Sequence, residues 1–258
     1  MEATEAIDLL RESTRKIASG QPHVSVAYSG GLDSSVIAAI AREFATVHCY
    51  ACAVEGSFDA GNAASRAESE SLDFTLIPLN TGQMPSIVRE AVELLQTLNP
   101  LQLAYTIPIL TVLKESTENL VLAGNGADEL FGGYAKYASA KDPSKLMADD
   151  IDKMLQEGER LKAAAIHFKK HIGFPFASEK LMAFSRSLPL DRKITPFTRK
   201  VILREVARNL GLPSHNLPKK AAQYSSGTLK EMEKLARAEG ISLSEWTRRI
   251  AGATGRSP

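Results

Sequence analysis

Two glycine-rich turns, each carrying carboxylates, follow short apolar runs of the sequence. The first reads SGGLDSS at residues 29–35, and the second reads GNGADELFGG at residues 124–133. Glycines let the backbone turn sharply and expose its N–H groups, and serine hydroxyls add further donors. The first turns of a following helix present unpaired N–H groups and the positive end of the helix dipole. The first turn therefore has the residue types of a phosphate-binding site.

Each turn also holds an aspartate, Asp33 in the first and Asp128 in the second. A carboxylate repels phosphate, so Asp33 fits a phosphate site only with a bridging cation, and Mg²⁺ binds through one or two carboxylates plus phosphate oxygens. We interpret Asp33 and Asp128 as the two ligands of one Mg²⁺ on a pyrophosphate group. The alternative is structural: Asp33 or Ser34 caps a helix, and Asp128 and Glu129 favour the first turn of another. A P-loop is excluded, because the chain contains no G-x-x-x-x-G-K-[ST].

The elements around these turns predict an α/β fold. Strands are expected at 24–28, 46–54, 74–79 and 119–123, and helices at 3–18, 34–44, 59–72, 84–97, 105–116, 144–170, 178–187, 196–210, 228–238 and 242–252. Alternating strands and helices predict a doubly wound parallel sheet with helices on both faces, followed by a helical C-terminal half with no strand after Tyr137. We divide the chain into an N-terminal helix (1–20), an α/β core (21–140) and a helical portion (141–258).

Composition limits the function classes. The 258 residues are 44% hydrophobic and 24% charged, and none of the apolar runs approaches the roughly 18 residues of a membrane span. The start lacks the pattern of a signal peptide and there are two cysteines, so we expect a cytoplasmic, reduced protein. The net charge of +1 conceals +8 from Asp191 onward and −7 before it. Solvated helix faces explain this asymmetry, and a basic surface for phosphate or tRNA is the alternative.

Both turns resemble those of a known enzyme family. Residues 29–35 are similar to the S-G-G-x-D-S pyrophosphate motif of the ATP pyrophosphatases (PP-loop enzymes), which split ATP between the α and β phosphates. The stretch 124–134 resembles the G-E-G-A-D-E-L-F-G-G-Y signature of asparagine synthetases and the related β-lactam synthetases. Further stretches resemble this family in the right order over residues 20 to 230: GSFDA (56–60), Pro175-Phe176 with LMAFSRSLP (181–189), KVILR (200–204) and Lys219-Lys220 before QYSSG (223–227).

The resemblance implies ATP and Mg²⁺ as cofactors and a set of site residues. Asp33 and Asp128 would hold the metal, Val54 would meet the adenine through its backbone, and Gly124 would lie near the ribose and α-phosphate. Lys220, or with less support Lys219, would neutralise charge that develops on the phosphates. The pyrophosphate would be held by the first turn, through Ser29, Gly30, Gly31, Asp33, Ser34 and Ser35.

Three departures from the family pattern stand out. Met1 is followed by Glu2 rather than by the catalytic cysteine of the glutaminase domain. We therefore expect ammonia or another amine as nitrogen source, supplied freely or by a separate glutaminase subunit. Asn125 replaces the glutamate that the family uses to bring ammonia onto the adenylate, and Asn cannot accept a proton. Ala177-Ser178 replaces Leu-Asp after Pro-Phe. The last two changes leave the acceptor open.

The favoured function is an ATP-dependent amide-forming ligase of the asparagine synthetase type, with Lys220, Asp33, Asp128 and Asn125 as its catalytic residues. Aspartate is the acceptor that the resemblance implies. One alternative keeps adenylation but changes the target, for example to a tRNA nucleotide, which the +8 region favours slightly. The other is a non-catalytic ATP-binding subunit of an amidotransferase, which Asn125 favours slightly. A homo-oligomer is left open, and no membrane partner is expected.

Other chemically able residues have structural interpretations. Cys49 and Cys52 lie three apart on a predicted strand, so their thiols point to opposite faces and we expect core packing, not a metal site. His167 and His171 have the i, i+4 spacing of a zinc pair on one helix face, but the lysines between them favour an exposed basic face. Tyr134 is expected either to line the acceptor pocket or to pack in the core.

Overall fold

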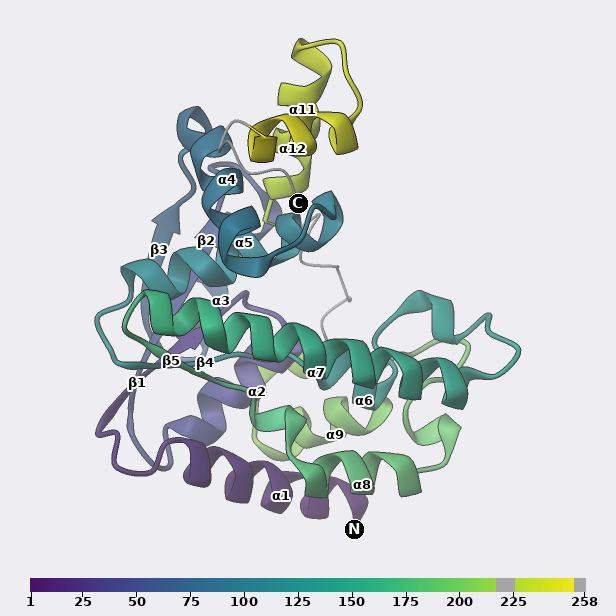
Figure 1. The fold of residues 1–258 in the computed structure, drawn as a ribbon. Coiled ribbons are helices and arrows are strands. Elements are labelled where there is room, and N and C mark those ends of the chain that lie inside the picture. Colours follow the sequence, from purple (N-terminus) through teal and green to yellow (C-terminus); the bar gives the residue numbers. More distant parts are fainter. Residues whose placement is uncertain (217–225, 253–258) are drawn as a thin grey trace.

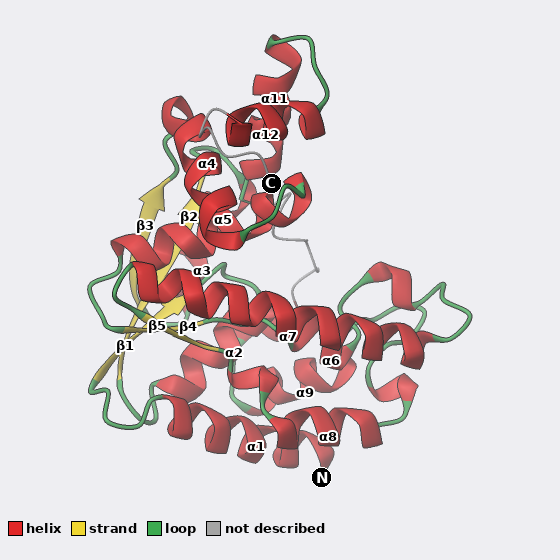
Figure 2. Ribbon diagram, viewed as in Figure 1, coloured by secondary structure: helices red, strands yellow, loops and turns green. Residues whose placement is uncertain are grey.

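A five-stranded, all-parallel sheet in the order β3-β2-β1-β4-β5 organises the chain in the computed structural model, which describes residues 1–216 and 226–252 (Figures 1 and 2). The strands are β1 (His23–Ala27), β2 (Thr46–Ala53), β3 (Asp73–Pro78), β4 (Leu120–Leu122) and β5 (His171–Gly173). The predicted α/β class with a parallel sheet is therefore confirmed.

Helices cover both faces of the sheet, as Figure 1 shows. One core packs against α1 (Glu2–Ile17), α2 (Leu32–Ala41), α3 (Phe58–Ser69), α6 (Ala127–Phe131), α8 (Glu179–Ser187) and α9 (Val201–Asn209). The other packs against α4 (Met84–Leu95), α5 (Pro100–Glu115), α7 (Pro143–His167), α11 (Thr228–Ala238) and α12 (Leu243–Gly252). Neighbouring residues of β4 alternate between the two cores, as the period of a strand requires: Leu122 faces the first core and Val121 the second.

The order of the strands decides where a ligand can bind. After β3 the chain crosses back, so that β4 pairs with β1 on the side away from β2, with Ser25 opposite Val121. Connections on the two sides of this switch point diverge and leave a crevice at the carboxyl ends of the strands. The turns that follow β1 and β4 therefore lie side by side, although about 90 residues separate them in the sequence.

The structure corrects three predicted elements. A fifth strand, His171–Gly173, follows Tyr137, where no strand was expected; its three residues are too short to show a period. Helix α5 begins at Pro100, not 105, because the Asn99 side chain accepts hydrogen bonds from the amides of Leu101 and Gln102 and caps it. Helix α9 begins at Val201 and not at 196.

The second core also joins parts that the predicted three-part division separates. It contains residues of α4 and α5 from the central portion together with residues of α7, α11 and α12 from the C-terminal portion. The N-terminal helix α1 packs in the first core with α8 and α9. The division at 1–20, 21–140 and 141–258 stays a prediction. Within the described residues, no helix combines the length and apolar character that crossing a bilayer requires.

Candidate active site

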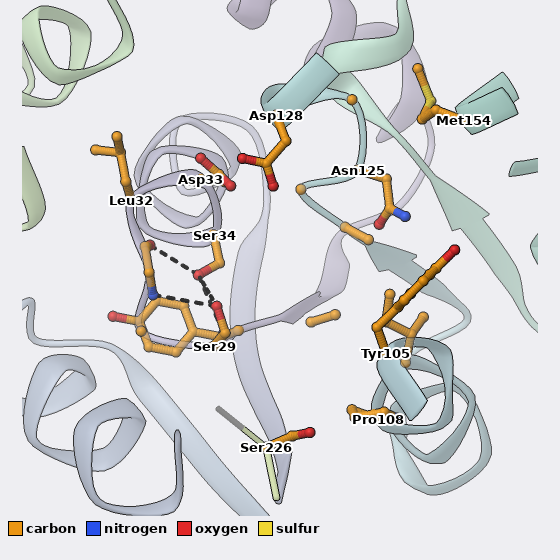
Figure 3. A pocket seen from close by; sticks show the side chains of 18 of the residues that line it. Ser29, Leu32, Asp33, Ser34, Tyr105, Pro108, Asn125, Asp128, Met154 and Ser226 are labelled. Atoms are coloured by element: carbon orange, nitrogen blue, oxygen red, sulfur yellow. Dashed lines mark hydrogen bonds between the residues drawn. The ribbon is translucent and has the colours of Figure 1, made fainter. Parts of the chain in front are cut away.

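The SGGLDSS turn joins β1 to α2 at the carboxyl edge of the sheet. Gly30 has φ +70°, and a Cβ there would lie 3.0 Å from the Cα of Ala63 on α3, so both its conformation and its packing require glycine. The Ser34 hydroxyl donates to the Gly31 carbonyl at 3.1 Å and accepts from the Ser29 amide at 3.3 Å (Figure 3). No side chain caps α2, whose N-terminal cap is Gly31. These contacts shape the turn and leave the start of α2 available to an anion.

The second turn joins β4 to the short helix α6 and touches the first. Gly126, with φ +97°, is the N-terminal cap of α6 and turns the chain so that Asp128 falls in the first turn of that helix. A Cβ on Gly124 would lie 3.1 Å from the Cβ of Asp33, so the two turns pack directly against each other. The predicted juxtaposition of Asp33 and Asp128 follows from this contact, and Figure 3 shows the two carboxylates facing each other.

A lysine joins the two carboxylates. The Lys200 ammonium lies 2.5 and 2.6 Å from the two oxygens of Asp33 and 2.7 Å from Asp128 Oδ1, and the side chain is only 2% exposed. Burial lowers the pKa of Lys200, but the charges of Asp128 and Asp33 more than offset it and raise the pKa above its ordinary value. Lys200 is also the N-terminal cap of α9, with φ +58°, an uncommon conformation for a residue with a side chain. We infer that this backbone position aims the ammonium between the turns.

The donor set fits the expected Mg²⁺. Oxygens of Asp33 and Asp128 both reach one nitrogen atom within 2.7 Å, so both can reach one cation. Two carboxylates leave most coordination positions to phosphate oxygens and water, which is how proteins usually hold Mg²⁺. Among the described residues, no cluster of three or more His, Cys, Asp or Glu side chains forms a metal site. The pair therefore suits a cation that arrives with phosphate rather than a cation that the protein alone encloses.

A cavity of about 540 Å³ extends from these turns between α5 and α7. Its far wall carries Tyr105 and Glu157, joined by a 2.8 Å hydrogen bond from the tyrosine hydroxyl, and Asn125 lies on the same side in Figure 3. Glu129 also lines the cavity and accepts a 2.7 Å hydrogen bond from the Tyr134 hydroxyl. Burial and the neighbouring Asp128 raise the pKa of Glu129 to about 7. The cavity as a whole has the size and mixed polarity of a small-molecule binding site.

Most predicted site residues line this cavity: Ser29, Gly30, Gly31, Asp33, Ser34, Gly124, Asn125 and Asp128. Ser35 is fully buried, with its hydroxyl 3.4 Å from that of Tyr28, and does not line it. Val54 is also outside the lining; its amide donates to Ser226 and its carbonyl accepts from Ser57. Roles for Ser35 and Val54 in ATP binding stay predictions. Lys219 and Lys220 lie outside the described residues.

Three further predictions concern residues near or away from the cavity. Tyr134 lines it and also packs against the small core cluster of Tyr137, Met147 and Ile194, so both of its predicted settings are present. Cys49 and Cys52 are buried free thiols that belong to opposite cores, as the strand period requires. His167 ends α7 and His171 begins β5, so they do not share a helix face; both are exposed.

The sequence reasoning missed Lys200, Glu129 and the Tyr105–Glu157 pair as cavity residues. Lys200 belongs to the KVILR stretch that resembles the family, and this was the available signal for it. Glu129 stands in the second motif, where its acidic side chain was assigned to the start of a helix. Nothing local marks Tyr105 or Glu157, because each lies on one face of a long amphipathic or apolar helix.

Comparison with known proteins identifies relatives over most of the chain. The family model "Asparagine synthase" matches residues 5–174 and 171–254. A putative glutamine-hydrolysing asparagine synthetase from Methanocaldococcus jannaschii is 27% identical over an alignment of 286 positions, which covers 93% of this chain and 53% of that protein. Asparagine synthetase B from Escherichia coli is 24% identical, with 86% and 46% covered. The chain thus spans about half the length of these curated relatives.

Among solved structures, the NMN synthetase from Francisella tularensis aligns with 97% of this chain and 90% of its own, at 12% identity and a TM-score of 0.47. The family assignment does not depend on this likeness. It depends on the family match, which spans both glycine turns, the KVILR stretch and the cavity walls between them. The chain belongs to the asparagine synthase family.

Proposed function

We propose that this protein is an ATP-dependent ligase that adenylates a substrate carboxylate and then forms an amide. The observation that carries the proposal is the convergence of Asp33 and Asp128 on one point beside an uncapped helix start and a glycine turn. Anions bind at such helix starts, and the paired carboxylates supply the ligands for a phosphate-bound cation. Family membership supports an ATP-using ligase.

Each part of the site has a role in this reaction. Backbone N–H groups of the first turn and the start of α2 would bind the β and γ phosphates, and Asp33 and Asp128 would hold Mg²⁺, which supplies charge neutralisation. A carboxylate oxygen of the acceptor attacks the α-phosphorus, and the bond from that phosphorus to the bridging oxygen of pyrophosphate breaks. Lys200, buried beside both carboxylates, holds them in position and keeps a positive charge near the leaving group.

The second half-reaction occurs at the far wall. The nitrogen of ammonia or another amine attacks the acyl carbon, the bond to AMP breaks, and the nitrogen loses a proton. Asn125 can donate and accept hydrogen bonds there but cannot take that proton. The tyrosine–carboxylate pairs Tyr105–Glu157 and Tyr134–Glu129 orient groups that face the acceptor. Aspartate is the first acceptor to test, because curated relatives carry the name asparagine synthetase.

The test is pyrophosphate release from ATP and Mg²⁺ across a panel of carboxylates, with ammonium or glutamine as nitrogen source. We expect one carboxylate to stimulate release, and amide to accumulate with ammonium. Asp33→Ala and Asp128→Ala should each abolish release, because either change breaks the shared site. If the intact protein binds ATP and releases no pyrophosphate with any carboxylate or tRNA, the enzyme assignment is wrong and a nucleotide-binding subunit is the better description.

A further inference from the structure

An arginine on α3 faces the phosphate end of the cavity. Asn62 and Arg66 are four residues apart, so they share one face of α3, and both line the cavity together with Ser29 and Gly30. The neighbouring face of the helix, with Ala63 and Ala67, is buried in the first core. Arg66 is therefore held next to the turn rather than over open solvent.

Close packing fixes α3 against the turn. Gly30 lies so near α3 that a Cβ would come within 3.2 Å of the Asn62 carbonyl oxygen. At the C-terminal cap of α3, Glu70 accepts a 3.0 Å hydrogen bond from the Tyr28 hydroxyl, and Tyr28 directly precedes the turn. Contacts at Asn62 and at Glu70 therefore hold α3 against the turn on both sides of Arg66. The Arg66 side chain therefore lines the cavity from a helix that is held beside the turn.

One donor of the Arg66 guanidinium is left without a hydrogen-bond partner. Nε of Arg66 is buried without a hydrogen-bond partner, and no ion pair to Arg66 is formed by the described residues. The charge of Glu70, four residues further along the chain, interacts with that of Arg66, but Glu70 Oε1 is also buried without a hydrogen-bond partner. A guanidinium has five donors in a planar fork that matches phosphate oxygens. An anion bound in the cavity would accept a hydrogen bond from the Nε–H group that the protein leaves unpaired.

Charge balance points the same way. The turn and the start of α2 offer N–H groups and hydroxyls but only one ionised side chain, the carboxylate of Asp33, whose charge Lys200 already compensates. A pyrophosphate leaving group gains negative charge as it departs, and this charge needs a cation on the side of the turn away from Lys200. Arg66 lines the cavity from α3, which packs against Gly30, whereas Lys200 contacts Asp33.

We propose that Arg66 binds the phosphoryl oxygens of the group that leaves as pyrophosphate, and so favours triphosphate over monophosphate ligands. This inference rests on the proposed use of ATP, but it concerns a residue outside both glycine motifs. Arg66 also differs from Lys200 in its role, because it contacts the ligand without holding the metal-binding carboxylates.

The experiment compares binding of Mg·ATP, Mg·pyrophosphate and AMP by isothermal titration calorimetry to the full chain and to Arg66→Gln and Arg66→Lys. We expect Arg66→Gln to weaken the binding of ATP and of pyrophosphate at least about tenfold, because one bidentate charged contact is lost. The binding of AMP should weaken less than about twofold. The affinity of Arg66→Lys for ATP and pyrophosphate should lie between those of the unchanged protein and Arg66→Gln, since the point charge of an ammonium replaces the planar guanidinium. The matched control is Arg42→Gln, which removes an arginine that donates to the Glu70 carbonyl from outside the cavity.

The outcomes separate this inference from the proposed function. If Arg66→Gln weakens AMP binding as much as ATP binding, Arg66 has a structural role and the inference fails. It also fails if Arg42→Gln weakens ATP and pyrophosphate binding as much as Arg66→Gln does. If pyrophosphate binding depends on Arg66 while no carboxylate stimulates turnover, the inference stands and the proposed ligase reaction fails. Thermal melting of each variant, together with the retained AMP affinity, excludes loss of the fold as the cause.

Discussion

The Lys200 ammonium and the Asp33 carboxylate form a buried ion pair, with nitrogen–oxygen distances of 2.5 and 2.6 Å, across two segments far apart in the sequence. The same ammonium reaches Asp128. One cation therefore links the turn after β1, the turn after β4 and the start of α9. Without it, two carboxylates would face each other in a partly buried site, where their repulsion is strong.

The first prediction tests this role of Lys200. Replacement by Met leaves both carboxylates without the ammonium, so the free energy of unfolding should fall by about 3 kcal/mol in EDTA, as for other buried pairs that lose one partner. Urea unfolding measures the change. Adding Asp128→Asn to Lys200→Met should restore part of the loss, because it removes the repulsion. The control is Lys136→Met, whose lysine is half-exposed beside Asp150 and should cost at most about 1 kcal/mol. Equal losses in the two single variants would show that the bridge is unimportant.

The second prediction concerns Gly133, behind the Asp128 side chain. A Cβ there would overlap the Asp128 carboxylate and lie 2.5 Å from Lys200 Cε. Gly133→Ala must therefore displace both groups, and we expect pyrophosphate release to drop at least about a hundredfold while the protein still folds. Gly61→Ala is the matched control: its Cβ meets open space on α3, and turnover should be unchanged. Normal turnover in Gly133→Ala would mean that the positions of Asp128 and Lys200 do not matter to the reaction.

The sequence predicts the pairing of Asp33 with Asp128 because both residues occupy equivalent places in the fold. Asp33 and Asp128 each follow a strand of one parallel sheet, and carboxyl ends of adjacent parallel strands meet at one edge, so local pattern and topology suffice to bring them together. Lys200 depends on how α9 packs in the first core, which no local pattern encodes. The hydrogen bond from the Val54 amide likewise depends on Ser226, which is far away in the sequence.

The same distinction explains the fold. Strands of five to eight residues, β1, β2 and β3, show apolar runs long enough to recognise. The three residues of β5 become a strand because Leu120 and its neighbours already offer an edge to pair with. Helix α5 was predicted to begin at 105 rather than at Pro100. Pro100 in fact occupies the first turn, where no amide partner is needed.

The third prediction uses the buried Lys193, which packs against Gly132 and is 8% exposed. Burial lowers its pKa from 10.5 to about 8. Between pH 8 and 10.5 the unfolded chain binds more protons than the folded one at this residue, so its contribution to stability rises with pH in that window. Lys193→Met should therefore raise the free energy of unfolding by about 1–3 kcal/mol at pH 7, with the gain shrinking toward pH 10.

Urea unfolding at pH 7 and pH 9.5 measures this pH dependence. Lys162→Met is the control, because Lys162 is exposed beside Glu159 and should change stability by less than about 0.5 kcal/mol at either pH. A gain in Lys193→Met that is the same at both pH values would indicate better packing rather than relief of a buried charge.

The last prediction concerns Asn125, at the far wall with Tyr105 and Met154 (Figure 3). If adenylation proceeds while position 125 provides no base, acyl-adenylate should form. It should then react slowly with ammonia near pH 7, because most ammonia is present there as ammonium. Asn125→Glu should then raise the ratio of amide to pyrophosphate with aspartate and ammonium. A positioned base contributes roughly 10²–10⁴-fold, so a partial gain is measurable. The gain should fade above pH 9.5, where free ammonia prevails.

Charge in the cavity opposes this gain and makes the experiment decisive. Glu129 and Glu157 already line the cavity, so a further carboxylate at position 125 repels an acidic acceptor. If Asn125 instead donates a hydrogen bond to the natural acceptor, its loss leaves a partner unpaired at about 1–3 kcal/mol. Asn125→Gln separates the effects, because it keeps the amide and adds no charge. The idea of a missing base is rejected if the ratio of amide to pyrophosphate is unchanged or lower in Asn125→Glu while Asn125→Gln resembles the unchanged protein. The search would then turn to acceptors other than aspartate.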